Sequence, residues 1–107
     1  MGRRFWRQGD LVFRKLDENE AASIGGVPIM TEVRIGSETG HPHTIRAKSI
    51  QVWGSTNETG LVTALDHAFV ESERPVEVQH DQHATLLLPE GRYIVRTVGL
   101  GRRRMFD

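Results

Sequence analysis

The feature that most constrains the fold of this chain is its succession of short apolar runs, each closed by turn-forming residues. Residues 75–80 read PVEVQH, in which Val76 and Val78 alternate with polar neighbours. A period of two places both valines on one face of a β-strand. Residues 55–60, STNETG, have the composition of a loop between strands. No segment keeps apolar residues at helical spacing, so the pattern predicts an all-β fold.

The remaining runs predict further strands, some with an identifiable irregularity. In residues 11–15 the side chains of Leu11, Phe13 and Lys15 share one face. Ser49 is expected to be a bulge or bend within residues 43–54. Pro89 and Gly91 occupy the second and fourth positions of a type I turn. The other expected strands are residues 27–35, 61–70 (for which a short helical turn is the less favoured alternative), 84–88 (largely buried) and 93–98. We predict a sandwich or barrel of about seven to eight short, mainly antiparallel strands.

The length and composition fit one globular domain spanning residues 1–107. The chain has 107 residues, with 37% hydrophobic and 26% charged, and no cysteine. The absence of cysteine excludes disulfide scaffolds, cysteine-ligated zinc or iron–sulfur sites and cysteine nucleophiles. No apolar run approaches the roughly 18 residues of a membrane-spanning helix, and the basic start lacks the apolar segment of a secretory signal. A cytoplasmic location without membrane contact is therefore expected.

The net charge of zero conceals an uneven distribution along the chain. Residues 1–15 and 101–107 hold eight basic and two acidic residues, which leaves six basic and twelve acidic residues in the middle. The basic terminal arms, residues 1–8 and 100–107, are either solvated or dock on an acidic partner. That partner is nucleic acid, which the acidic body disfavours, or the body of a neighbouring copy in a homo-oligomer or larger assembly. The candidate contact residues are Arg3, Arg4, Arg7, Arg102, Arg103 and Arg104.

Four of the five histidines form two close pairs, and these are the candidate metal ligands. His41 and His43 lie two residues apart, where an extended strand points both to one side. His80 and His83 fit a turn at the end of a strand, which can aim both rings inward. Neutral imidazole is a common ligand of zinc and iron. The expected cofactor is a divalent metal, Zn or Fe, unless the histidines only bond to backbone groups at strand ends.

Two acidic residues stand beside these pairs and extend the candidate site. Glu38 and Asp81 are candidates for an extra metal ligand or for a general base. The fifth histidine, His67, is isolated and is expected to be a half-buried strand residue. No catalytic residue, nucleophile elbow, phosphate-binding glycine loop or helical HExxH motif is identified.

The HxH pair partly resembles the first motif of the cupins. The cupin pattern, however, has a glycine six residues before HxH and a glutamate a few residues after it. This chain has Ile35 at the first position and Ala47 and Lys48 near the second. The resemblance implies a cupin-like barrel but leaves the cupin metal site incomplete.

A longer resemblance covers most of the chain. The segments RQGDLVFRKLDE, TGHPHTI and FVESERPVEVQHDQHATLLLPEGRYIVRTV occur in this order. They resemble a family of small, uncharacterised bacterial and phage-encoded β-proteins with the frame QGD, TGHxH, H[DE]xH and LPxGxYxV. The resemblance implies that the two histidine pairs belong together, but it implies no reaction. Members carry an acidic residue four positions before the first histidine, where this chain has Ser37, and an aromatic-acidic tail where this chain has GRRRMFD.

Three hypotheses for function follow. The leading hypothesis is a non-enzymatic accessory or binding module in which His41, His43, His80 and His83 bind a divalent metal that braces two segments of the chain. The second is a phage virion or assembly component, resembling a capsid-decoration protein, with the histidines at an interface and a virion-associated location. The third is a metal-dependent, cupin-like enzyme.

Overall fold

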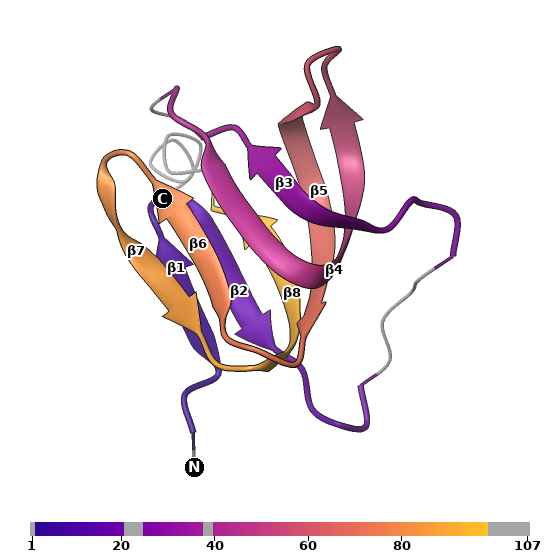
Figure 1. Ribbon diagram of the computed structural model, residues 1–107, viewed down its shortest axis with the longest axis vertical. Helices are drawn as coiled ribbons and strands as arrows, with labels where there is room; N and C mark the ends of the chain where they lie inside the picture. The colour runs from indigo at the N-terminus through magenta and orange to yellow at the C-terminus, as the bar shows by residue number, and fades with distance from the viewer. Residues whose placement is uncertain (1, 21–24, 38–39, 99–107) are drawn as a thin grey trace, which may run out of the picture.

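The computed structural model describes residues 2–20, 25–37 and 40–98, and these form eight β-strands in one curled, barrel-like sheet (Figure 1). The prediction of a small all-β domain with seven to eight strands is confirmed. The strands are β1 (Phe5–Gln8), β2 (Leu11–Lys15), β3 (Met30–Ile35), β4 (His43–Thr56), β5 (Leu61–Ser72), β6 (Val76–His80), β7 (His83–Leu88) and β8 (Gly91–Thr97). Glu38 and residues 100–107, with Arg102, Arg103 and Arg104, lie outside the described residues.

The strand order is β1-β2-β8-β5-β3-β4-β6-β7, with β4 also paired to β5. Pairing is antiparallel except for a short parallel match of β3 with β5. The curvature of the sheet brings its two end strands, β1 and β7, into contact. The barrel interior is filled by the inward-facing apolar side chains, which include Leu11, Phe13, Ile45, Val70, Tyr93 and Val95, all fully buried.

Strand β4 is long and bent, and its two halves pair with different strands of the sheet. Its first residues pair with β6, and its residues from Ser49 onward pair with β5. Between them, Met30 and Glu32 of β3 lie opposite Ile50 and Arg46 of β4, so β4 carries extra residues at this point. The irregularity predicted at Ser49 falls within that segment. Such an insertion bends a strand and increases its twist, which curls the sheet.

Two sequence expectations about burial and strand ends are wrong. Residues 84–88 were expected to be largely buried, but β7 is the last strand of the sheet and Leu87 is 62% exposed, while Leu88 alone in this run is buried. An end strand lacks a neighbour on one side, so an apolar run does not imply burial there. His41 was expected on a strand with His43, but β4 begins at His43 and His41 lies in the preceding loop.

The link between β7 and β8 consists of Pro89 and Glu90, with a bend at Glu90, and the type I turn expected there stays a prediction. The two strands do not pair with each other, so this short link crosses between separate parts of the sheet. The Tyr93 hydroxyl donates a hydrogen bond to the Pro89 carbonyl and anchors the crossing. Burial raises the pKa of Tyr93 to about 12, so this donor keeps its proton at every physiological pH.

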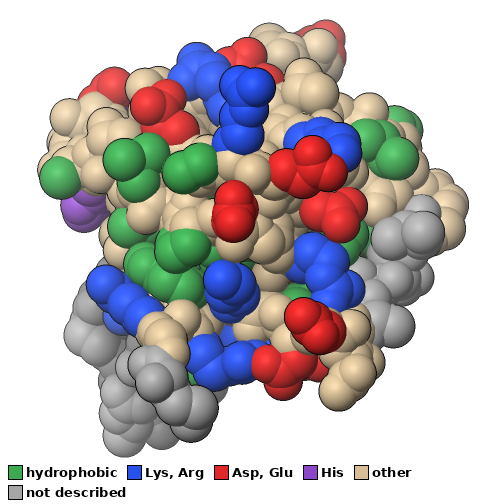
Figure 2. Space-filling view, turned by 60° about the horizontal axis from the view of Figure 1, so that its bottom comes forward, with side chains coloured by type: hydrophobic (Ala, Val, Ile, Leu, Met, Phe, Trp, Pro, Cys, Tyr) green, Lys and Arg blue, Asp and Glu red, His purple; other side chains and the backbone are tan. Residues whose placement is uncertain are grey.

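The first residues of the chain are bound to the body of the protein. Residues 5–8 of the N-terminal arm form β1. Arg4 contacts Asp17 at 2.5 Å and Glu20 at 3.5 Å. The Arg3 Nε donates to the Phe5 carbonyl, and the Arg7 Nε donates to the Gly9 carbonyl. Figure 2 shows basic and acidic side chains interspersed on one face of the molecule. Contact of these arginines with an acidic partner stays a prediction.

Candidate functional site

The site begins at the tight turn between β1 and β2, which consists of Gly9 and Asp10. Gly9 has φ of +59°, a conformation that favours glycine at the first central position of a hairpin turn. A Cβ at this position would lie 2.8 Å from the His83 Nε2 and 3.4 Å from the His43 Cε1. Gly9 therefore allows two histidine rings to pack directly on the turn.

Gln8 fixes the orientation of its own amide. Its Nε2 donates to the carbonyls of Val78 at 3.0 Å and Ala84 at 2.9 Å. A reversed amide would set its oxygen against two carbonyl oxygens, so the Oε1 must be the atom that faces His43. Gln8 thus joins β1 to β6 and β7, and its side chain spans the contact between the two end strands of the barrel.

His43 is fully buried at the start of β4, between two acceptors. Its Nδ1 lies 2.9 Å from the Gln8 Oε1, and its Nε2 lies 2.9 Å from the Asp10 Oδ1. Because the Gln8 Oε1 can only accept, the His43 Nδ1 carries a proton and donates it. Burial lowers the pKa of His43, the contact with Asp10 opposes this, and the charges of His80 and His83 reinforce it.

A neutral His43 with a proton on Nδ1 has a lone pair on Nε2. That lone pair faces the Asp10 carboxylate, which is 7% exposed and is also an acceptor when ionised. Two acceptors at 2.9 Å repel unless a cation, either a proton or a metal ion, lies at or between them. The arrangement therefore provides a place for one positive charge at the base of the β1–β2 turn.

Three of the four predicted histidine ligands lie close together. The ring centroids of His43 and His80 are 4.5 Å apart, and those of His80 and His83 are 4.6 Å apart. The predicted turn between His80 and His83 is present, but it aims only His80 inward, because His83 is exposed. His41 is more remote: its ring centroid lies 6.2 Å from that of His80, and its Nδ1 lies 3.3 Å from the Asp81 Oδ2.

His80 has a defined tautomer that limits its role. Its Nδ1 accepts a hydrogen bond from the Gln82 backbone N–H at 3.0 Å. A neutral ring then carries its proton on Nε2, and this atom is not a metal ligand in the present orientation. The described residues contain no group of three His, Asp or Glu side chains arranged to hold a metal ion.

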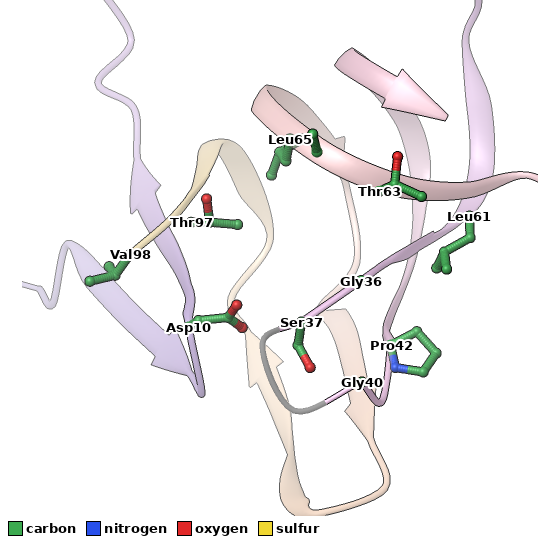
Figure 3. Close-up of a pocket in the computed structure, with 11 residues that line it drawn as sticks. Asp10, Gly36, Ser37, Gly40, Pro42, Leu61, Thr63, Leu65, Thr97 and Val98 are labelled. Carbon is green, nitrogen blue, oxygen red and sulfur yellow. The ribbon is translucent and has the colours of Figure 1, made fainter. Parts of the chain in front are cut away.

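A cavity of about 530 Å³ opens beside Asp10 at one end of the barrel. Figure 3 shows Asp10 facing Ser37 and Gly40 across it, with Thr97 and Thr63 from β8 and β5 on the other walls. This volume is in the range of small-molecule binding sites. Asp10 thus connects the buried His43 to a space that solutes can enter.

Sequence reasoning missed Gln8 and Asp10 as members of this site. The available signal was the QGD segment itself, residues 8–10, which lies more than 30 residues before the histidine pairs in the sequence. Asp81 lies beside His41, away from His43. His67 is a partly buried residue of β5, as expected, and it stacks on Trp53.

Comparisons with known proteins give a family but no function. No curated protein and no solved structure matches the chain. Among the described residues, no helix has the length and apolar character needed to cross a membrane. A family model described as "Domain of unknown function (DUF8820)" matches residues 7–98, which include the QGD turn and both histidine pairs. The chain therefore belongs to the DUF8820 family.

Proposed function

We propose that this domain is a non-enzymatic binding module that holds a divalent metal ion, zinc or ferrous iron, between the His43 Nε2 and the Asp10 Oδ1. The observation that carries the proposal is the pair of facing acceptors 2.9 Å apart, with the tautomer of His43 set by Gln8. Metal-bound histidines commonly donate their second N–H to a carbonyl group in this way.

The separation of the two atoms suits coordination. Two ligands that each lie about 2.1 Å from one ion are about 3.4 Å apart in tetrahedral zinc, but about 2.9 Å apart when the bonds meet near a right angle, as in six-coordinate ferrous iron. A hydrogen bond has the same length, so distance alone favours neither a metal nor a proton. The lowered pKa of His43 favours the neutral ring, which is the form that binds metals.

His83 is the candidate third ligand. Its Nε2 lies against the Gly9 turn, next to His43. Its side chain is exposed, so its ring can rotate toward the ion, although the rotation costs its packing on the Gly9 turn. Two imidazoles and one carboxylate form a ligand set typical of ferrous iron and of zinc with open positions. The ion would then tie the β1–β2 turn to β4 and β7.

The experiment is metal analysis of the untagged protein, with melting curves in the presence of a chelator and after addition of zinc or ferrous iron. Asp10→Asn should abolish the metal-dependent rise in melting temperature, because the amide keeps the shape but removes the charge. Asp66→Asn is the matched control, since Asp66 contacts His67 at 2.6 Å on the surface. Metal-free protein whose melting temperature neither metal changes would overturn the proposal.

A further inference from the structure

The cavity beside Asp10 is separate from the proposed metal position, although the two share one carboxyl group. The Asp10 Oδ1 lies 2.9 Å from the His43 Nε2, and the same carboxyl group borders the cavity of about 530 Å³ (Figure 3). Among the described residues that line this space, Asp10 is the only charged one. Its side chain is 8% exposed, so solvent screens its charge weakly. The cavity therefore favours a cation and disfavours an anion.

The other walls of the cavity indicate which kind of cation fits. Ser37, Thr63 and Thr97 supply hydroxyl groups that can accept hydrogen bonds, and Leu61 and Leu65 supply apolar surface. A guanidinium group is a planar fork of N–H donors that forms paired hydrogen bonds with a carboxylate. It is also more weakly hydrated than an ammonium group, so it enters a partly enclosed space at a lower desolvation cost.

We propose that this cavity is a binding site for a guanidinium group, which pairs with the Asp10 carboxylate while its attached alkyl chain packs on Leu61 and Leu65. The binding does not require the metal ion of the proposed function. A metal ion between Asp10 and His43 would neutralise the same carboxylate, so the two cations compete for its charge.

The guanidinium group has two possible sources, a free compound and the chain itself. Val98 lines the cavity, and its backbone N–H donates a hydrogen bond to the Asp10 carbonyl at 2.7 Å. Arg102, Arg103 and Arg104 follow Val98 by four to six residues in the sequence. Four extended residues span about 13 Å, so these arginines are within reach of the cavity.

The test is an NMR titration of full-length protein from which metal has been removed, with propylguanidine as the probe and propylurea as its uncharged analogue. Propylguanidine should shift the amide resonances of Ser37, Gly40 and Thr97. It should bind at least about tenfold more tightly than propylurea, the value of hydrogen bonding to a charged partner. Asp10→Asn should remove this preference. Asp81→Asn is the control and should keep it, because Asp81 is 79% exposed and lies outside the cavity.

Replacement of Arg102, Arg103 and Arg104 by Gln in the full chain distinguishes the two sources. Tighter propylguanidine binding by this variant than by the wild type assigns the cavity to the chain's own arginines, and equal binding assigns it to a free compound. Binding to neither protein, equal binding of propylurea, or an unchanged preference in Asp10→Asn overturns the inference. If Asp10→Asn does not fold, the comparison with propylurea and the positions of the shifted resonances decide. Failure of the metal proposal leaves these results unaffected, because all are obtained without metal.

Discussion

Of the three histidine–carboxylate pairs among the described residues, the two shortest have similar distances and different surroundings. His43 lies 2.9 Å from Asp10 in the barrel interior, and His67 lies 2.6 Å from Asp66 on the outer surface of β5. The first pair joins residues 33 positions apart, whereas the second joins sequence neighbours. In the buried pair, each polar atom needs a hydrogen-bond partner within the protein, and the Gln8 Oε1 is this partner for the His43 Nδ1.

The difference between the pairs shows that contact distance alone does not indicate importance. Solvent surrounds Asp66, whose side chain is 76% exposed, so its attraction to His67 is screened. His67 is held mainly by stacking on Trp53, with ring centroids 4.6 Å apart and ring planes 7° apart. The exposed pair is a local surface contact, while the buried pair connects the first turn of the chain to β4.

The two pairs should differ most in unfolding free energy when Gln8, which holds His43 of the buried pair, is replaced. Gln8→Leu leaves the carbonyls of Val78 and Ala84 and the Nδ1 of His43 without their partner. We expect the free energy of unfolding, measured by urea denaturation, to fall by about 3 kcal/mol. His67→Leu is the control and should change it by less than about 0.5 kcal/mol. A loss below about 1 kcal/mol in Gln8→Leu would show that water replaces the amide.

The Gly9 turn offers a second way to disturb the buried pair. Gly9→Ala combines positive-φ strain with a Cβ 2.8 Å from the His83 Nε2, and it should cost about 2 kcal/mol of unfolding free energy. Gly60→Ala is matched, because Gly60 has φ of +87° and open space around its Cβ position. It should cost about 1 kcal/mol, the strain alone. Equal losses in both variants would mean that the histidine contact carries no energy.

Acidification should affect the buried pair through His43. Burial lowers the pKa of His43 below its usual 6.5, so the unfolded chain takes up this proton first. The stability that buried, neutral His43 contributes is complete above pH 6.5 and is lost as the pH falls toward the lowered pKa of His43. In denaturation curves of metal-free protein below pH 6.5, His43→Gln should lose less stability per pH unit than the wild type. An identical slope would contradict this.

The smallest effect is expected at the exposed carboxylate. Asp66→Asn should change the free energy of unfolding by less than about 0.5 kcal/mol at low salt, and by less still at high salt. Urea denaturation at two salt concentrations is the measurement. A loss above about 1 kcal/mol would place the exposed pair in the same energetic class as the buried one and remove the contrast between them.

The fold was largely predictable because strand signals are local. Val76 and Val78 alternate with polar residues, and both are buried, as a half-buried strand requires. The bend near Ser49 was also visible, since the apolar alternation changes phase there. The exposure of Leu87 was not predictable, because it depends on β7 being the last strand of the sheet, and strand order is a property of the whole chain.

The candidate site was only half predictable for the same reason. The histidine pairs stand out by their spacing, but nothing local shows that Gln8 and Asp10 face His43. Asp10 looks like an ordinary turn residue, and turns with aspartate are common on protein surfaces. Conversely, Asp81 lies between two of the histidines in sequence, yet it contacts His41 instead. Proximity along a chain is a poor guide to a site assembled across a barrel.

The span of Gln8 has a consequence for how the protein reaches its native state. Its partners Val78 and Ala84 lie 70 and 76 residues further along the chain, and His43 lies 35 residues away. Contacts between such distant segments form slowly, because the conformational entropy of a long stretch of chain is lost before the contacts contribute favourable free energy. The hydrogen bond from the His43 imidazole to Gln8 therefore requires that the first and middle thirds of the chain have met, and the Gln8 amide that accepts it is oriented only when the last third has joined them. Its proton resonance would report the final step of folding.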